Sequence, residues 1–253
     1  PGVGKSTLLS ALVKAWRARG KSIGVIAVDP SSRRTGGALL GDRTRIVTDP
    51  ADAGVYIRSM AARDRLGGLA ELTFPAMVLM RAVFDVVIVE TVGVGQSETD
   101  VVAVADTVLF CVQPGSGDSL QFMKAAIAAI PHPTAVTKAD LGAPAARARA
   151  DVDGALSLAE AGGEGWMLQV LLLSAASGAG IEALIDRVEA HRAFLAQESR
   201  GGIQRLRQAE TWMEDLLRAQ FGRHGLARAG QIALKPRQSP FARAAEIAQR
   251  LRG

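Results

Sequence analysis

Pro1-Gly2-Val3-Gly4-Lys5-Ser6-Thr7 is the stretch on which the predicted fold depends. It matches the end of the pattern G-x-x-x-x-G-K-[ST], in which small residues let backbone N–H groups converge on phosphate oxygens. A helix that begins near Ser6 would direct the positive end of its dipole at the same place. We expect phosphate to be bound by Gly2, Val3, Gly4, Lys5, Ser6 and Thr7, with Lys5 at the β- and γ-phosphates and Ser6 at Mg²⁺. The first glycine of the pattern and the strand before it would lie upstream of Pro1.

Apolar, β-branched runs alternate with helical stretches after this loop. The predicted strands are Ile23–Val28, Asp85–Val89, Thr107–Val112, Gln169–Leu173 and the shorter Ala135–Val136. The predicted helices are Ser6–Arg19, Leu69–Val83, Ser119–Ile130, Ala143–Glu160 and Gly180–Ala196, and Pro75 places the start of the second near Thr73–Pro75. Apolar strands alternating with helices indicate a mostly parallel sheet covered on both faces. With the phosphate loop, this predicts the three-layer α/β/α fold of P-loop NTPases.

The character of the sequence changes near residue 197. Gln204–Phe221 has apolar residues at helical spacing, the stretch from Gly222 to Pro240 is rich in Gly, Arg and Pro, and a last helix is predicted at Phe241–Leu251. We therefore predict a phosphate-loop domain at 1–196 and a helical extension at 197–253. The extension is a candidate dimer contact, and ordinary packing onto the parent domain is the equal alternative.

Composition limits the class of protein. The chain of 253 residues is 48% hydrophobic, which is enough for a large buried core, and its single cysteine, Cys111, excludes an internal disulfide. No apolar stretch approaches the roughly 20 residues of a membrane span. We expect a cytoplasmic protein with no membrane association. The net charge of +5 comes from arginines in the C-terminal third. No aromatics interleave with these arginines, so we do not expect a nucleic-acid partner.

Two predicted strands end in carboxylates that a phosphate-bound metal ion requires. Val28 runs into Asp29, and Val89 runs into Glu90. Both would face the phosphate site, because ligands bind at the carboxyl edge of a parallel sheet. Glu90 begins an acid-x-x-Gly pattern whose Gly93 N–H could contact the γ-phosphate. Asp42 lies in a long polar loop. The predicted metal set is Ser6, Asp29, Asp42 and Glu90, and the predicted catalytic set is Lys5, Asp29, Glu90 and Gly93. A turn or helix-cap role is the alternative for Asp29 and Asp42.

The residue after the switch glycine also bears on hydrolysis. Small GTPases often place a water-orienting glutamine directly after this glycine, whereas this chain has Val94. A valine side chain has no polar atom with which to orient water. We therefore expect slow intrinsic hydrolysis that a partner accelerates.

Thr137-Lys138-Ala139-Asp140 follows a short predicted strand and is similar to the Asn-Lys-x-Asp pattern that reads guanine. Asp140 would accept both the N1–H and the 2-amino hydrogens of guanine, and the stem of Lys138 would stack along the base. Ser174-Ala175 follows a later strand and would present a backbone N–H to the guanine O6. We therefore expect GTP and GDP, not adenine nucleotides, as the ligands.

Several longer segments resemble one family. They are 28–32, 35–45, 57–61, 66–70, 87–98 and 114–118 with Gln121, which include Val28-Asp29-Pro30-Ser31-Ser32 and Glu90-Thr91-Val92-Gly93-Val94-Gly95-Gln96-Ser97-Glu98. In this order they resemble the MeaB/ArgK-type GTPases, which are methylmalonyl-CoA mutase-associated G-protein chaperones of the SIMIBI class. The likeness covers roughly residues 1 to 191 and departs from the family at Thr137 and at Arg33-Arg34.

The resemblance implies a Mg²⁺-dependent GTPase, usually a homodimer. Such a protein gates cofactor loading of an adenosylcobalamin-dependent acyl-CoA mutase and protects or reactivates it. Residues from Pro114 to Lys124 would form a third loop that relays the nucleotide state to the mutase. The alternative is an ATP-dependent kinase or ATPase of a lysine/arginine/ornithine transport system, against which Asp140 argues. Nickel insertion is disfavoured because the chain has only His132, His191 and His224, widely spaced, and one cysteine.

Overall fold

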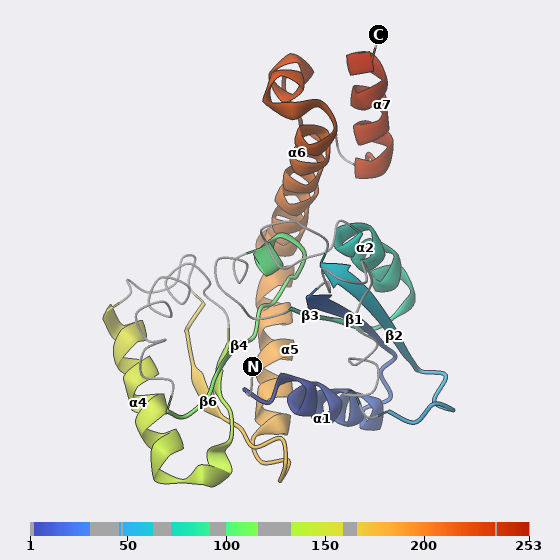
Figure 1. The fold of residues 1–253 in the computed structure, drawn as a ribbon. Coiled ribbons are helices and arrows are strands. Elements are labelled where there is room, and N and C mark those ends of the chain that lie inside the picture. The colour runs from blue at the N-terminus through green and yellow to red at the C-terminus, as the bar shows by residue number, and fades with distance from the viewer. Residues whose placement is uncertain are drawn as a thin grey trace. The chain divides into compact units, whose positions relative to one another are not determined.

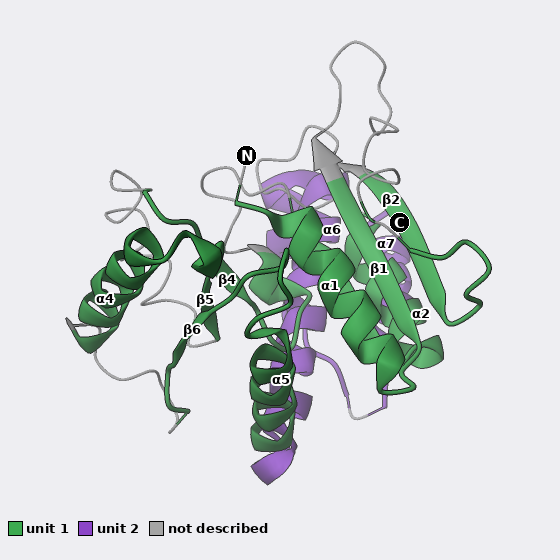
Figure 2. Cartoon of the chain, turned by 90° about the horizontal axis from the view of Figure 1, so that it is seen from below, with its two compact units in different colours: residues 1–194 green, residues 195–253 purple. Residues whose placement is uncertain are grey.

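The computed structural model divides the chain into two compact units, Pro1–Phe194 and Leu195–Gly253 (Figure 2). The residues that the structure describes are 3–30, 46, 48–62, 72–91, 100–115, 133–158, 166–235 and 237–252. Within them, no helix combines the length and the apolar character needed to cross a membrane.

All the strands of the first unit that are described run parallel. One sheet has the order β2-β1-β3, with β1 at Ile23–Pro30, β2 at Val55–Ala62 and β3 at Val86–Glu90. The other has the order β4-β5-β6, with β4 at Phe110–Val112, β5 at Thr134–Val136 and β6 at Val170–Leu172. The predicted parallel α/β fold is confirmed. In the described part of the chain it consists of two three-stranded sheets, and strand β4 is shorter than predicted.

Strand β2 is absent from the strands that we predicted. It pairs with β1 along its whole length, from Ile23 opposite Val55 to Pro30 opposite Ala62. The predicted strands are wholly apolar runs, which are typical of strands buried on both faces. Here Tyr56 and Arg58 are exposed, and the residues beside them are partly buried. The alternation is that of an edge strand with one face in water.

The described helices lie close to their predicted ranges. They are α1 at Lys5–Ala18, α2 at Thr73–Val83, α4 at Ala143–Leu158 and α5 at Ile181–Ala196. Short 3₁₀ turns occupy Asp100–Ala103, Ala139–Leu141 and Gln197–Ser199. Helix α2 begins at Thr73, because Pro75 has no N–H to donate and is tolerated only in a first turn. The helix predicted at Ser119–Ile130 lies outside the described residues.

One hydrophobic core fixes helix α1, and therefore the phosphate loop before it. Leu8, Leu12 and Trp16 of α1 are buried against residues of β1 and α5. Helix α5 lies beside α1 in both views (Figures 1 and 2). Its Leu184 and Ile185 are fully buried. Each such side chain contributes about 2 kcal/mol of transfer free energy, so this cluster holds α1 rigidly on the sheet.

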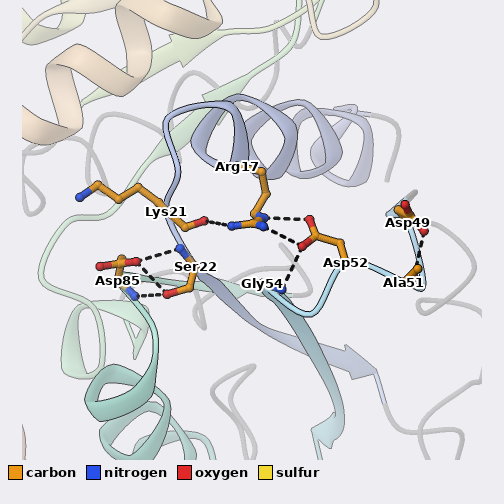
Figure 3. Close-up of polar contacts among 8 residues, drawn as sticks. All are labelled: Arg17, Lys21, Ser22, Asp49, Ala51, Asp52, Gly54 and Asp85. Atoms are coloured by element: carbon orange, nitrogen blue, oxygen red, sulfur yellow. Dashed lines mark hydrogen bonds and ion pairs between the residues drawn. The ribbon is translucent and has the colours of Figure 1, made fainter.

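A polar cluster fastens the opposite, amino edge of the first sheet (Figure 3). The guanidinium of Arg17 donates to both carboxylate oxygens of Asp52, at 2.8 and 2.7 Å, and to the carbonyl of Lys21 at 2.8 Å. Ser22 and Asp85 exchange hydrogen bonds, with the Ser22 N–H and hydroxyl both 2.8 Å from Asp85 Oδ2. These contacts join the end of α1 to the starts of all three strands.

The second unit contains the helices α6, at Arg200–Ala229, and α7, at Pro240–Arg252. The helix end predicted at Phe221 coincides with a kink, because Gly222 has the non-helical angles φ 67° and ψ −174°, and the helix that follows to Ala229 was not predicted. A positive φ is a conformation that favours glycine and interrupts a helix, and here a second helical segment follows the interruption. Leu217 and Ala229 pack with Ile247 and Leu251 of α7 in a core of their own.

Candidate functional site

The phosphate loop leads into α1 through a conformation suited to glycine. Gly4 has φ 84° and ψ 23°, a left-handed geometry that costs a residue with a side chain about 1–2 kcal/mol. No side chain in the described part of the chain caps α1, and the Leu8 N–H donates to the Gly4 carbonyl at 2.9 Å. The first turn therefore presents backbone N–H groups and the positive end of the helix dipole, which is the standard arrangement for an anion.

Lys5 lies near strand β4. Burial raises the pKa of the Cys111 thiol to about 12, and the charge of Lys5 opposes part of that rise. A thiol with so high a pKa stays protonated at neutral pH, which disfavours Cys111 as a nucleophile. Cys111 is therefore a small, largely buried residue that packs against the core.

Ser6 and Glu90 lie in contact. The Ser6 hydroxyl donates to Glu90 Oε1 at 3.4 Å, across 84 residues of sequence. Asp29 lies near the carboxyl end of β1, two residues beyond Ala27, which stands opposite Glu90 in the register. A hydroxyl and a carboxylate at this distance are the hard oxygen ligands that Mg²⁺ prefers, and Mg²⁺ takes few protein ligands beside phosphate oxygens. The residues present therefore fit a magnesium site.

The rest of the predicted metal and switch set is not placed. Asp42 and Gly93 lie outside the described residues, as do Gly2 and Val94, and of Asp29 only the backbone is described. Among the described residues, no group of three or more His, Cys, Asp or Glu side chains could hold a metal ion by itself.

Thr137 connects the predicted base loop to the phosphate loop. Its hydroxyl oxygen is 2.9 Å from the Val3 carbonyl and 3.1 Å from the Val112 carbonyl, and its N–H donates to Val112 at 2.8 Å. The side chain is 5% exposed. A hydroxyl has a single proton, so it donates to one carbonyl at a time. The sequence pattern pointed to Thr137 but not to this bond, which spans 134 residues.

Asp140 and Ser174 also come together, although they belong to different loops. The Ser174 hydroxyl donates to the Asp140 carboxylate and is the main cause that lowers the pKa of Asp140, and Lys138 adds a smaller effect of the same sign. Ser174 is 1% exposed, and its oxygen also accepts the Ser177 N–H at 3.3 Å. Asp140 is therefore held as an anion, the form that can accept two N–H groups of a base.

The structure refines which N–H the second base loop can offer. The Ser174 N–H donates to the Ala179 carbonyl at 2.9 Å, so it is already used. The N–H of Ala175 is then the candidate donor of the Ser174-Ala175 pair. Thr7 is exposed beside Lys5 and Ser6. The described part of the predicted site thus divides into a phosphate end on α1 and β3 and a base end on β5 and β6, with Thr137 between them.

Comparison with known proteins identifies the family of the chain. The family described as "Methylmalonyl Co-A mutase-associated GTPase MeaB" matches residues 1–228. The chain belongs to the MeaB family. A relative from Pyrococcus abyssi is 45% identical over 202 residues, which are 79% of this chain and 62% of the relative. The mitochondrial methylmalonic aciduria type A homolog of Mus musculus is 35% identical over 227 residues, 88% of this chain and 55% of its own length. This MeaB-family chain thus spans about three fifths of these relatives.

The fold is also that of a solved structure. A crystal structure named "LAO/AO transport system kinase" superimposes with a TM-score of 0.65 at 26% identity, covering 98% of this chain and 79% of that one. The match extends over nearly the whole chain, including both of its units. The predicted family and the predicted α/β fold are therefore confirmed.

Proposed function

We propose that this MeaB-family protein binds GTP with Mg²⁺ and hydrolyses it to GDP and phosphate. The observation that carries the proposal is the bond from Thr137 to Val3, because it joins a base-reading loop to a phosphate loop. Neither loop alone is specific for a guanine nucleotide, whereas the two together would contact both its base and its phosphates. The contact between Ser6 and Glu90 adds the oxygen ligands of a metal ion at the phosphate end.

Each residue has a definite task in this proposal. The N–H groups of the first turn of α1 and the ammonium of Lys5 bind the β- and γ-phosphates and stabilise negative charge on them. Ser6, Glu90 and Asp29 would hold Mg²⁺, which supplies charge neutralisation at the phosphates when bound. Gly93 would contact the γ-phosphate. Because Val94 cannot orient the attacking water, intrinsic hydrolysis is slow and a partner accelerates it.

Asp140 decides the choice of base. Its carboxylate matches the adjacent N1–H and 2-amino donors of guanine, whereas adenine has an acceptor at N1 and no amino group at position 2. Calorimetry with Mg-GTP and Mg-ATP should show binding of GTP alone. Asp140→Asn should abolish that preference, because an amide presents only one acceptor. Asp151→Asn on the exposed face of α4 is the matched control and should bind GTP like the wild type. Equal affinity of the wild type for the two triphosphates would refute guanine recognition.

The partner that we propose is an adenosylcobalamin-dependent acyl-CoA mutase of the methylmalonyl-CoA mutase type. The support is the family description and the mouse relative. The protein would gate loading of the cofactor and protect or reactivate the mutase in the cytoplasm. A pull-down with GDP and with a non-hydrolysable GTP analogue should recover such a mutase in a nucleotide-dependent way. Recovery of the same amount in both states would contradict nucleotide gating.

We also propose that the protein is a homodimer in which the helices of residues 197–253 form the contact. Exposed apolar side chains on α6 support this, since Ile203 is 48% and Leu206 42% exposed. Sedimentation velocity should give a dimer for the wild type and a monomer for Ile203→Glu. A monomeric wild type would refute the proposal.

A second candidate is an ATP-dependent kinase of a transport system, favoured by the name of the solved neighbour. The same calorimetry separates it from the GTPase, because a transport kinase of this kind would bind Mg-ATP. Recovery of transporter subunits in place of a mutase in the pull-down would also favour it.

A further inference from the structure

The backbone of Lys138 is fixed on both sides. Its predecessor Thr137 is bonded to Val112, and the N–H of its successor Ala139 donates to the Leu173 carbonyl at 2.8 Å. Lys138 itself has φ 55° and ψ 43°, a left-handed conformation that costs a lysine about 1–2 kcal/mol. Such strain persists only where the surrounding structure determines it. The part of Lys138 that remains adjustable is therefore its long, exposed side chain.

The tip of that side chain meets Gln113. Lys138 Nζ donates to Gln113 Oε1 at 3.4 Å, the long end of the hydrogen-bond range. Gln113 directly follows strand β4 and is half-buried. Its neighbour Val112 is buried and accepts the N–H of Thr137, and the Thr137 hydroxyl oxygen lies 3.1 Å from the same carbonyl. The acceptor therefore follows the same strand that binds the base loop, and it lies against the exposed ammonium of Lys138.

We propose that Gln113 is a positioning residue of the nucleotide site, which holds the Lys138 side chain in the orientation that receives the base. The proposal rests on the proposed binding of guanine nucleotides. An exposed lysine loses up to about 2 kcal/mol of rotamer entropy when a ligand orders it. An acceptor that already restrains the ammonium in the free protein removes part of this cost, so the base binds more tightly.

The first test changes the acceptor without changing the size of the side chain. Gln113→Met keeps the length but removes the oxygen, and it should weaken GTP and GDP about three- to fivefold, as expected for a partly exposed bond to a charged group. The factor should be the same for both nucleotides, since the contact is at the base end. Gln113→Glu keeps the acceptor and should bind within about twofold of the wild type. Gln220→Met on exposed α6 is the matched control, and the thermal midpoint should be alike in all variants.

The second test asks whether Gln113 acts through Lys138. In a Lys138→Met background, Gln113→Met should change GDP affinity by less than about 1.5-fold, because the group that it positions is gone. A full three- to fivefold loss in that background, or no loss in the wild-type background, would overturn the role of Gln113 and leave the proposed GTPase standing. Failure of the wild type to bind guanine nucleotides would overturn the proposed function itself, and the role of Gln113 with it.

Discussion

Replacing Thr137 by valine tests the contact that joins the two ends of the site. Valine has nearly the same shape, so the substitution removes the hydroxyl and leaves the packing of β5. The Val112 carbonyl keeps the Thr137 N–H at 2.8 Å, whereas the Val3 carbonyl loses its donor at 2.9 Å. The net loss is one hydrogen bond, which is worth about 1 kcal/mol. That corresponds to about fivefold in an equilibrium constant.

The loss should appear in both nucleotide binding and stability. We expect Thr137→Val to weaken GTP and GDP about fivefold in calorimetry, because the phosphate loop is no longer tied to the base loop. The free energy of unfolding in urea should fall by about 1 kcal/mol. Thr134→Val is the matched control, since Thr134 is also buried, at 3% exposure, but lies within β5 and outside the two loops.

Two results would refute this reasoning. Unchanged nucleotide affinity in Thr137→Val would mean that the bond to Val3 does not hold the phosphate loop in its binding geometry. Equal weakening of nucleotide binding by Thr134→Val would mean that the loss of either buried hydroxyl disturbs the site. The bond between Thr137 and Val3 would then have no special role.

Three further predictions concern the framework around the site. Hydrogen bonding by Arg17 lowers the pKa of Asp52, so the pair stabilises the fold above the unfolded pKa of about 3.9 and this is lost on acidification. Asp52→Asn should make the urea midpoint fall less between about pH 5 and about pH 3 than it does in the wild type. Burial lowers the pKa of His191 to about 4, so stability should fall as the pH drops from about 6.5 to about 4, and His191→Gln should remove that slope. Gly180→Ala should destabilise by about 3 kcal/mol or more, because its Cβ would lie 2.3 Å from the Leu172 carbonyl at φ 78°, whereas Gly178→Ala, with open space at φ 77°, should cost about 1 kcal/mol.

Each of these has a result that would contradict it. An Asp52→Asn protein with the wild-type pH profile would show that the ion pair does not persist in solution. A His191→Gln protein that still loses stability between pH 6.5 and pH 4, by about the wild-type amount, would assign the titration to another group. Equal cost of the two glycine substitutions, measured by urea unfolding, would show that β6 and its following turn move apart without penalty.

Short motifs were the part of the site that could be predicted. The phosphate loop, the Glu90 switch acid and the Thr137-Lys138-Ala139-Asp140 pattern each lie within a few consecutive residues, because one turn or one strand end supplies their chemistry. Strand and helix types followed from the spacing of apolar residues, because that spacing is also contained within one short segment of sequence. Strand β2 was missed because exposed residues alternate in it with partly buried ones, so it contains no continuous apolar run. The helix after Gly222 was missed because a glycine can either end a helix or only kink it.

The sequence by itself determined which chemical groups this protein has for a nucleotide, since a lysine, a hydroxyl and a carboxylate keep their chemistry wherever the chain places them. Only the tertiary structure decided which of those groups act together. Thr137 reaches Val3 across 134 residues, Ser6 reaches Glu90 across 84, and Lys138 reaches Gln113 across 25. Such pairs depend on how parallel strands order themselves in a sheet, and that order follows from burial of the whole core and leaves no mark at either residue.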